Sequence, residues 1–128
     1  MELIVLKSNS GTEENRARQL KYAVKINDLL IERALNDENI TLFNPLKTPK
    51  LFNIVGEEFN KQYCEYENDP NIVKKQVPAR KILEMIMKER VETGNIYLFH
   101  EENVNQPSML NRYINSSNLC TEITLPSR

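Results

Sequence analysis

Residues 20–35 read LKYAVKINDLLIERAL, and this stretch indicates the fold class because a strand pattern comes directly before a helix pattern. The alternating apolar side chains that predict the strand, with lysines between them, are Leu20, Tyr22, Val24 and Ile26. Asn27 suits the cap of a helix that begins near Asp28, since an Asn side chain can accept a hydrogen bond from the first helical turn. The apolar side of that helix carries Leu29, Leu30, Ile31 and Leu35, and the polar run 36–39 ends it. A strand followed by a helix is typical of an α/β fold.

The clearest helix lies later in the chain, between Pro78 and Gly94. Pro78 suits a first helical turn, and Gly94 stands where a helix often ends in a left-handed residue. The apolar stripe between them consists of Ala79, Ile82, Leu83, Ile86, Met87 and Val91. Asn95–Phe99 then predicts another short strand, so the α/β pattern repeats.

The segments around these elements predict shorter structures. Ile40–Phe43 is a short apolar segment, and residues 51–66 have helix-like apolar spacing with an interruption at Gly56. Glu101–Asn111 is expected to be a polar loop. Met1–Lys7 is too short for periodicity to distinguish a strand from the end of a helix.

Size and composition predict one folded domain. The chain has 128 residues, of which 40% are hydrophobic and 27% charged. Its net charge is −1, so no broad basic surface for nucleic acid is expected. No apolar stretch approaches the roughly 20 residues that span a bilayer, and the N-terminal segment lacks the pattern of a signal peptide. We therefore expect a cytoplasmic protein with no nucleic acid or membrane partner.

The two cysteines, Cys64 and Cys120, are far apart in the sequence and the single histidine is His100. No pair has metal-ligand spacing, so the sequence predicts no zinc site and no disulfide framework. Free thiols fit a reducing compartment, although sequence alone leaves a disulfide between these two open.

A last strand is predicted from about Ser116 to Leu125. Successive side chains of a strand point to opposite faces, which would place Asn118, Cys120 and Glu122 on one side. The opposite, packing side would carry Leu119, Thr121 and Ile123. An amide, a thiol and a carboxylate together can bind a substrate, transfer hydrogen and move a proton. The alternative is that Cys120 is inert and that Asn118 and Glu122 face water. By residue type alone this alternative is favoured over a chemical site by about two to one.

The string Ser117-Asn118-Leu119-Cys120-Thr121-Glu122-Ile123 resembles the active-site strand of the class I ribonucleotide reductase large subunit. Earlier segments resemble the same family in the same order. They are Lys7–Arg18 with Gly-Thr-Glu-Glu-Asn-Arg-Ala-Arg, Ile26–Arg33, Thr41-Leu42-Phe43, Gly56-Glu57-Glu58-Phe59 and Glu92-Thr93-Gly94. The resemblance covers nearly the whole chain.

This resemblance implies that residues 1–128 are part of a ten-stranded α/β barrel, ending just after the active-site cysteine strand. It also implies that Met1–Lys7 is the end of a helix. By the same resemblance, Cys120 would be the thiol that forms a thiyl radical and abstracts the 3′ hydrogen of a ribonucleotide. Glu122 would be the general base for the 3′ hydroxyl, and Asn118 would form a hydrogen bond to the sugar.

The family reduces its substrate with a pair of cysteines that flank this region, and neither is present here. Cys64 matches neither of them and is read as a packing or surface thiol. The resemblance implies no cofactor in this chain, a radical supplied by a metal-containing small subunit, and ATP or dNTP effectors bound elsewhere. His100, beside Glu101 and Glu102, is read as a solvated side chain rather than an acid-base catalyst.

Two functions follow as hypotheses. In the first, the chain is part of a split or truncated large subunit and reduces ribonucleoside diphosphates with other large-subunit polypeptides and the small subunit. In the second, it is a non-catalytic remnant that docks on a reductase as a structural or regulatory piece. The intact set Asn118, Cys120 and Glu122 favours the first.

Overall fold

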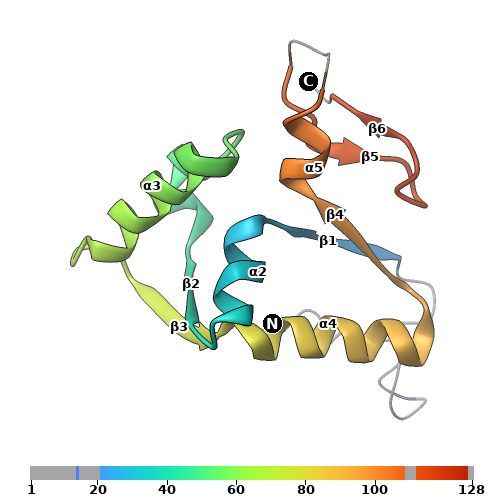
Figure 1. The fold of residues 1–128 in the computed structure, drawn as a ribbon, viewed down its shortest axis with the longest axis horizontal. Helices are drawn as coiled ribbons and strands as arrows, with labels where there is room; N and C mark the ends of the chain where they lie inside the picture. The colour runs from blue at the N-terminus through green and yellow to red at the C-terminus, as the bar shows by residue number, and fades with distance from the viewer. Residues whose placement is uncertain (1–13, 15–20, 109–111, 127–128) are drawn as a thin grey trace.

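The computed structural model describes residue 14 and residues 21–108 and 112–126 of the chain. Figure 1 shows a central pair of strands with helix α2 against it, a long helix α4 running beneath, and helix α3 set to one side. The expectation for Met1–Lys7 concerns residues outside this range, as does Leu20 at the start of the first predicted strand.

The strand and helix predicted from residues 20–35 are confirmed within the described part of the chain. Strand β1 spans Tyr22–Ile26 and helix α2 spans Asp28–Leu35. Asn27 caps the helix as expected, because its Oδ1 accepts a hydrogen bond from the Leu30 backbone N–H at 3.0 Å. Leu29 and Leu30 are buried, whereas Leu35 is 75% exposed. The buried contacts of α2 therefore come from Leu29, Leu30 and Ala34 and not from its last apolar residue.

Between α2 and α4 the chain forms two paired strands whose connecting segment contains a helix. Strands β2 (Asn39–Phe43) and β3 (Lys74–Pro78) pair in antiparallel register, and helix α3 (Gly56–Asn68) connects them. The helix predicted over residues 51–66 starts later than expected, at Gly56. Gly56 has φ +64°, and Pro49–Leu51 forms a short 3₁₀ turn instead.

Helix α4 (Ala79–Thr93) confirms the clearest helix of the sequence. Gly94 ends it at φ +69° with its N–H donating to the Arg90 carbonyl at 2.8 Å, the αL cap that the glycine predicts. Pro78 is the last residue of β3, one place before the first turn. Val91 is 83% exposed, so the apolar stripe is buried only in its first part.

Strand β4 (Ile96–His100) follows, one residue later than predicted, and pairs in parallel with β1. Beyond it, the polar loop predicted for Glu101–Asn111 is wrong at its start. Glu101–Asn105 forms the short helix α5, because the His100 Nδ1 accepts a hydrogen bond from the Asn103 N–H at 3.3 Å and satisfies a free donor of the first turn.

Every sheet in the described residues has two strands: β1 with β4, β2 with β3, and β5 (Ser116–Ser117) with β6 (Thr124–Leu125). The mixed α/β content is as predicted, but these residues do not close a barrel. The main core lies where α2, β2, α3 and the start of α4 meet. Its buried side chains are Ile26, Leu29, Leu30, Ala34, Ile40, Tyr63, Val77 and Ala79.

Tyr63 connects this core to the free edge of β2. Its hydroxyl accepts from the Thr41 N–H at 2.6 Å and donates to the Thr41 carbonyl at 2.7 Å. These backbone groups point away from β3, so a side chain substitutes for a neighbouring strand.

The described helices include none that is both long and apolar enough to cross a bilayer.

Candidate functional site

The segment with the three predicted site residues is a tight hairpin rather than one strand. Ser116 pairs with Leu125 and Ser117 with Thr124, and residues 118–123 form the loop between them. Figure 1 shows this hairpin beside α5. The prediction of a continuous strand over residues 116–125 is therefore wrong, since the chain reverses direction at its middle.

Asn118 closes this loop through its backbone and its side chain. Its N–H donates to the Ile123 carbonyl at 3.1 Å, and its Oδ1 accepts from the Ile123 N–H at 3.1 Å. Its carbonyl accepts from the Thr121 N–H at 3.2 Å. Short polar side chains such as Asn compete in this way with a regular ladder, which explains why the strand pattern is broken here.

Thr121 lies at the turn with φ +68°. A left-handed conformation is uncommon for a β-branched residue and costs about 1–2 kcal/mol. Its Oγ1 is buried without a hydrogen-bond partner among the described residues. The hydrogen bonds of Asn118 to Thr121 and Ile123 therefore hold the loop in a strained shape.

The loop presents its chemical groups to solvent. Asn118, Cys120 and Glu122 are all exposed, and Cys120 is a free thiol. The apolar face predicted for Leu119 and Ile123 is wrong, since these side chains are 69% and 53% exposed. A reversing chain does not keep the two-residue alternation of a strand, so residue parity no longer assigns faces. The hairpin gathers the amide, thiol and carboxylate on one short loop.

Asn105 fastens this hairpin to the rest of the chain. Its Nδ2 donates to the Ile114 carbonyl at 3.0 Å and its Oδ1 accepts from the Ile114 N–H at 2.7 Å. Ile114 is itself 4% exposed. Sequence reasoning gave Asn105 no role, although Asn is a residue type whose side chain often bonds to backbone.

Tyr113, next to Ile114, provides a second attachment. Its hydroxyl donates to Glu101 Oε1 at 3.3 Å, and burial together with the nearby Glu101 charge raises the pKa of this phenol. The phenol therefore stays protonated at neutral pH and remains a donor. The position of the hairpin depends on α5 through both contacts.

His100 is not the solvated side chain expected from the sequence. Its side chain is 18% exposed, and its Nε2 lies 3.1 Å from Asp28 Oδ1. The parallel pairing of β1 and β4 produces this contact, because it aligns Ile26 with His100. Cys64, by contrast, is a free and exposed thiol on α3, which agrees with its reading as a surface residue.

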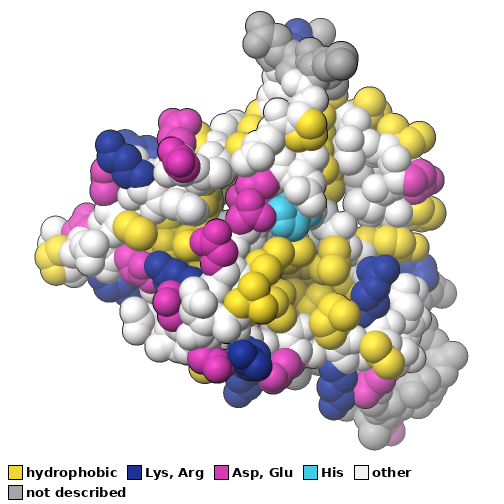
Figure 2. All heavy atoms as spheres, in the orientation of Figure 1, with side chains coloured by type: hydrophobic (Ala, Val, Ile, Leu, Met, Phe, Trp, Pro, Cys, Tyr) yellow, Lys and Arg dark blue, Asp and Glu magenta, His cyan; other side chains and the backbone are white. Residues whose placement is uncertain are grey.

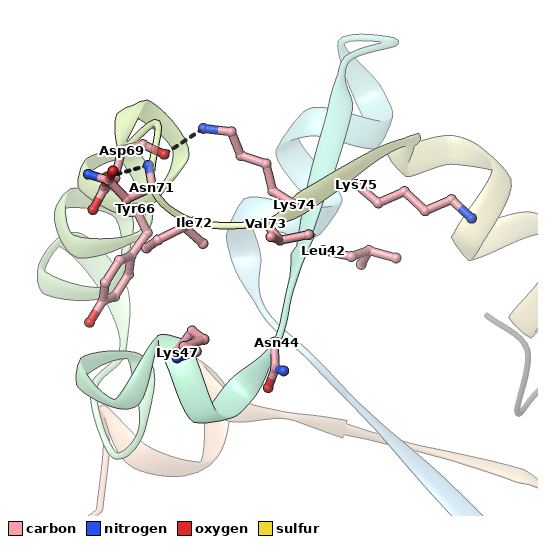
Figure 3. Close-up of a pocket in the computed structure, with 10 residues that line it drawn as sticks. All are labelled: Leu42, Asn44, Lys47, Tyr66, Asp69, Asn71, Ile72, Val73, Lys74 and Lys75. Carbon is pink, nitrogen blue, oxygen red and sulfur yellow. Dashed lines mark hydrogen bonds between the residues drawn. The ribbon is translucent and has the colours of Figure 1, made fainter.

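A pocket of about 680 Å³ lies between β2, β3 and the end of α3, and none of the predicted site residues lines it. Figure 3 shows apolar side chains such as Val73 between polar ones. Lys74 Nζ donates to the Asp69 carbonyl at 3.0 Å, and the Asn71 N–H donates to Asp69 Oδ1 at 2.8 Å. The local polar groups of this pocket are thus largely engaged with one another.

Comparison with known proteins covers the whole chain. The family model described as the barrel domain of ribonucleotide reductase matches residues 1–128. A ribonucleoside-diphosphate reductase subunit alpha of Buchnera aphidicola is 45% identical over 132 aligned positions, covering 98% of this chain and 17% of the relative. Subunit alpha of reductase 1 of Escherichia coli is 41% identical with the same coverage. The Helicobacter pylori subunit alpha is 40% identical over 96% of this chain and 16% of the relative.

The chain thus spans about a sixth of the length of the curated relatives it matches. The match includes the hairpin with Cys120 as well as the elements that carry it. With a family model that extends over every residue and relatives above 40% identity, the chain belongs to the ribonucleotide reductase family, in the barrel domain of the large subunit.

Proposed function

We propose that this chain supplies the radical-bearing cysteine of a ribonucleoside-diphosphate reductase and that it works as part of a larger assembly. Residues 1–128 are then part of the catalytic barrel. The observation that carries the proposal is the free, exposed thiol of Cys120 on a fixed loop between Asn118 and Glu122. Family membership supports the assignment of the loop to ribonucleotide chemistry.

In the proposed reaction, a thiyl radical on Cys120 takes the 3′ hydrogen atom of the ribose. An S–H bond forms as the C3′–H bond breaks, and the radical passes to the sugar carbon. Glu122 accepts the proton of the 3′ hydroxyl as general base, a role open to an exposed carboxylate that a substrate can reach. Asn118 orients the sugar. Because its Oδ1 already accepts from the Ile123 N–H, its amide hydrogens are the groups that remain to donate.

The remaining chemistry comes from partners. The electrons for reduction come from a cysteine pair on other segments of the large subunit, and a separate metal-containing small subunit generates the radical. The substrate is a ribonucleoside diphosphate, and nucleotide effectors bind outside this chain. Each of these assignments rests on the names of the relatives and on the resemblance of the sequence.

Physical features of the chain favour assembly with other polypeptide segments of the large subunit. The β1–β4 sheet has two strands in the described residues, and parallel sheets are almost always larger and covered on both faces. Leu119, Ile123 and Leu125 are more than half exposed on the hairpin. Figure 2 also shows apolar side chains gathered on one face beside the histidine. We infer that further barrel strands cover these surfaces.

The test is ribonucleoside diphosphate reduction by this chain combined with the neighbouring large-subunit polypeptides and the small subunit. Cys120→Ser is expected to abolish reduction, because a hydroxyl does not replace the thiol in hydrogen-atom transfer. Cys64→Ser is the matched control, since Cys64 is also free and exposed, and it is expected to retain activity. Glu122→Gln should lower turnover about 10²- to 10⁴-fold, the usual contribution of a general base.

Reduction that survives Cys120→Ser, or that proceeds equally without this chain, would overturn the proposal. The second candidate, a non-catalytic piece that docks on a reductase, would then be favoured. Its supporting observation is the same set of exposed apolar side chains on the hairpin. It predicts that Leu119→Ser weakens binding to the other polypeptides while Cys120→Ser leaves both binding and reduction unchanged.

A further inference from the structure

A second cluster of chemical groups lies where the parallel strands β1 and β4 end. Parallel strands bring their carboxyl ends to one edge of a sheet, and ligand sites commonly form there. Ile26 pairs with His100 at this edge. The residues that follow place Asp28 in the first turn of α2 and Glu102 in the first turn of α5. Residues far apart in sequence therefore meet at one point.

The three side chains lie close enough to share one ion. His100 Nε2 is 3.1 Å from Asp28 Oδ1, and His100 Nδ1 is 3.8 Å from Glu102 Oε2. One ligand atom from each residue lies within 4.8 Å of the others. Figure 2 shows the histidine at the surface beside acidic side chains, so an ion has access from solvent.

Glu102 supplies independent support because one of its carboxyl oxygens is buried and has no hydrogen-bond partner among the described residues. This oxygen is Oε2, and the residue is 2% exposed. Its separation from His100 exceeds hydrogen-bonding distance. A buried carboxylate without a partner is costly, and buried charges in proteins are normally paired or bound to metal. This carboxylate oxygen faces the imidazole that would share the ion.

The neighbouring charges do not compensate Glu102. Lys25 forms its ion pair with Glu101, at 3.3 Å, and its ammonium lies 5.6 Å from the centroid of the Phe99 ring. Within the described residues, no lysine or arginine forms an ion pair with Glu102. The cluster thus carries two carboxylates with one imidazole, a combination that attracts a cation.

We propose that Asp28, His100 and Glu102 bind a divalent transition-metal ion of the Zn²⁺ type. His100 Nε2 is the nitrogen that remains for the ion, because Nδ1 accepts a hydrogen bond from the Asn103 N–H. This nitrogen and two carboxylate oxygens form a ligand set that suits Zn²⁺, and the fourth position is filled by water. In a tetrahedral site with bonds of about 2.0–2.1 Å, ligand atoms lie roughly 3.3 Å apart. His100 Nε2 and Asp28 Oδ1, at 3.1 Å, already have nearly that separation, and the Asp28 side chain is 53% exposed.

The position of the site gives the ion a structural role at the base of the hairpin. Helix α5 carries both Glu102 and Asn105, and Asn105 holds Ile114 next to the hairpin. The ion ties α5 to the start of α2. This site is separate from the chemistry proposed for Cys120, so its test does not depend on reductase activity.

The experiment is a titration of the full chain with Zn²⁺ in competition with a coloured chelator, repeated with Co²⁺ to record its visible absorption. One ion per chain is expected. His100→Ala, Glu102→Gln and Asp28→Asn should each weaken binding about tenfold or more. Asp37→Asn is the matched control, because Asp37 is an exposed carboxylate that pairs with Arg80 instead, and it should leave affinity unchanged.

A background without thiols removes the competing ligands. The titration is therefore made in a Cys64→Ser, Cys120→Ser chain, and circular dichroism verifies that each variant keeps its helices. If the folded chain binds no Zn²⁺ at about 100 μM metal, where a site with a dissociation constant of that size is half filled, the proposal is overturned. Binding that is unaffected by His100→Ala overturns it equally.

Discussion

Removing the charge of Glu67 tests how α2, β2 and α3 are joined beside the main core. Arg33 of α2 donates to Glu67 of α3 through two hydrogen bonds of 2.7 Å, one to each carboxylate oxygen. Thr41 of β2 donates to the same carboxylate at 2.5 Å. The side chains of Arg33 and Glu67 are 13% and 17% exposed, so water screens the pair only in part. In Glu67→Gln, one acceptor becomes an amide donor that faces the donors of its partners.

The expected cost follows from these contacts. A hydrogen bond to a charged group contributes about 1.5–3 kcal/mol, and a partly buried Arg33 loses its counter-charge. We expect Glu67→Gln to lower the free energy of unfolding by about 2–3 kcal/mol at pH 7. For a chain of this size that corresponds to a fall in Tm of roughly 6–12 °C.

The same pair predicts a pH dependence. The hydrogen bonds from Arg33 hold the pKa of Glu67 below its ordinary value of 4.5. A group with a depressed pKa in the folded state stabilises the protein above its unfolded pKa, and this contribution is lost as pH falls through the folded pKa. The stability advantage of the unmodified chain over Glu67→Gln should therefore be full at pH 7 and shrink below about pH 4.5.

Urea unfolding followed by circular dichroism measures both effects. Glu65→Gln is the control on the same helix, since Glu65 is exposed and accepts a hydrogen bond only from nearby Gln62 in the described contacts. Its effect should stay within about 0.5 kcal/mol. If Glu67→Gln costs less than about 1 kcal/mol, or if its cost is the same at low and neutral pH, the pair does not join these elements as argued.

Three other substitutions test single contacts. Tyr63→Phe removes the two hydrogen bonds to the buried backbone of Thr41 and should cost about 2–3 kcal/mol in urea unfolding, whereas a loss below about 0.5 kcal/mol would contradict this role. Gly94→Ala should cost about 1 kcal/mol through its φ of +69° alone, because a Cβ there meets no atom within 4 Å, and an unchanged midpoint would refute the strain. Asn105→Ala should speed amide exchange of Ile114 at least tenfold by NMR, a change of about 1.4 kcal/mol, and equal protection in both proteins would exclude the anchor.

Local signals predicted most of the elements between residues 21 and 100. The Asn27 cap and the Gly94 terminus act within one helical turn of their own residues, so the sequence near them is sufficient. The start of α3 was harder to predict. The helix-like apolar spacing begins at residue 51, before Gly56, but the positive φ of Gly56 delays the start of the helix to that residue. Periodicity reports which residues can be buried and not where the backbone turns.

The candidate site was predicted by residue identity and not by shape. Asn118, Cys120 and Glu122 were singled out from a seven-residue string, and their roles remain proposals. The predicted arrangement of these residues on one strand was wrong, because alternating apolar and polar residues are compatible with a strand and with a hairpin loop. The side-chain bond of Asn118 and the positive φ of Thr121 distinguish the two, and neither is visible in a hydrophobic pattern.

The sequence by itself determined the family and the helices α2 and α4, because both depend on residues that are adjacent or a few places apart. Only the tertiary structure decided which distant groups meet. The parallel pairing of β1 with β4 brings Asp28 to His100, and the bonds of Asn105 place the hairpin against α5. These contacts join segments whose separation along the chain carries no local signal, so their geometry follows from packing alone.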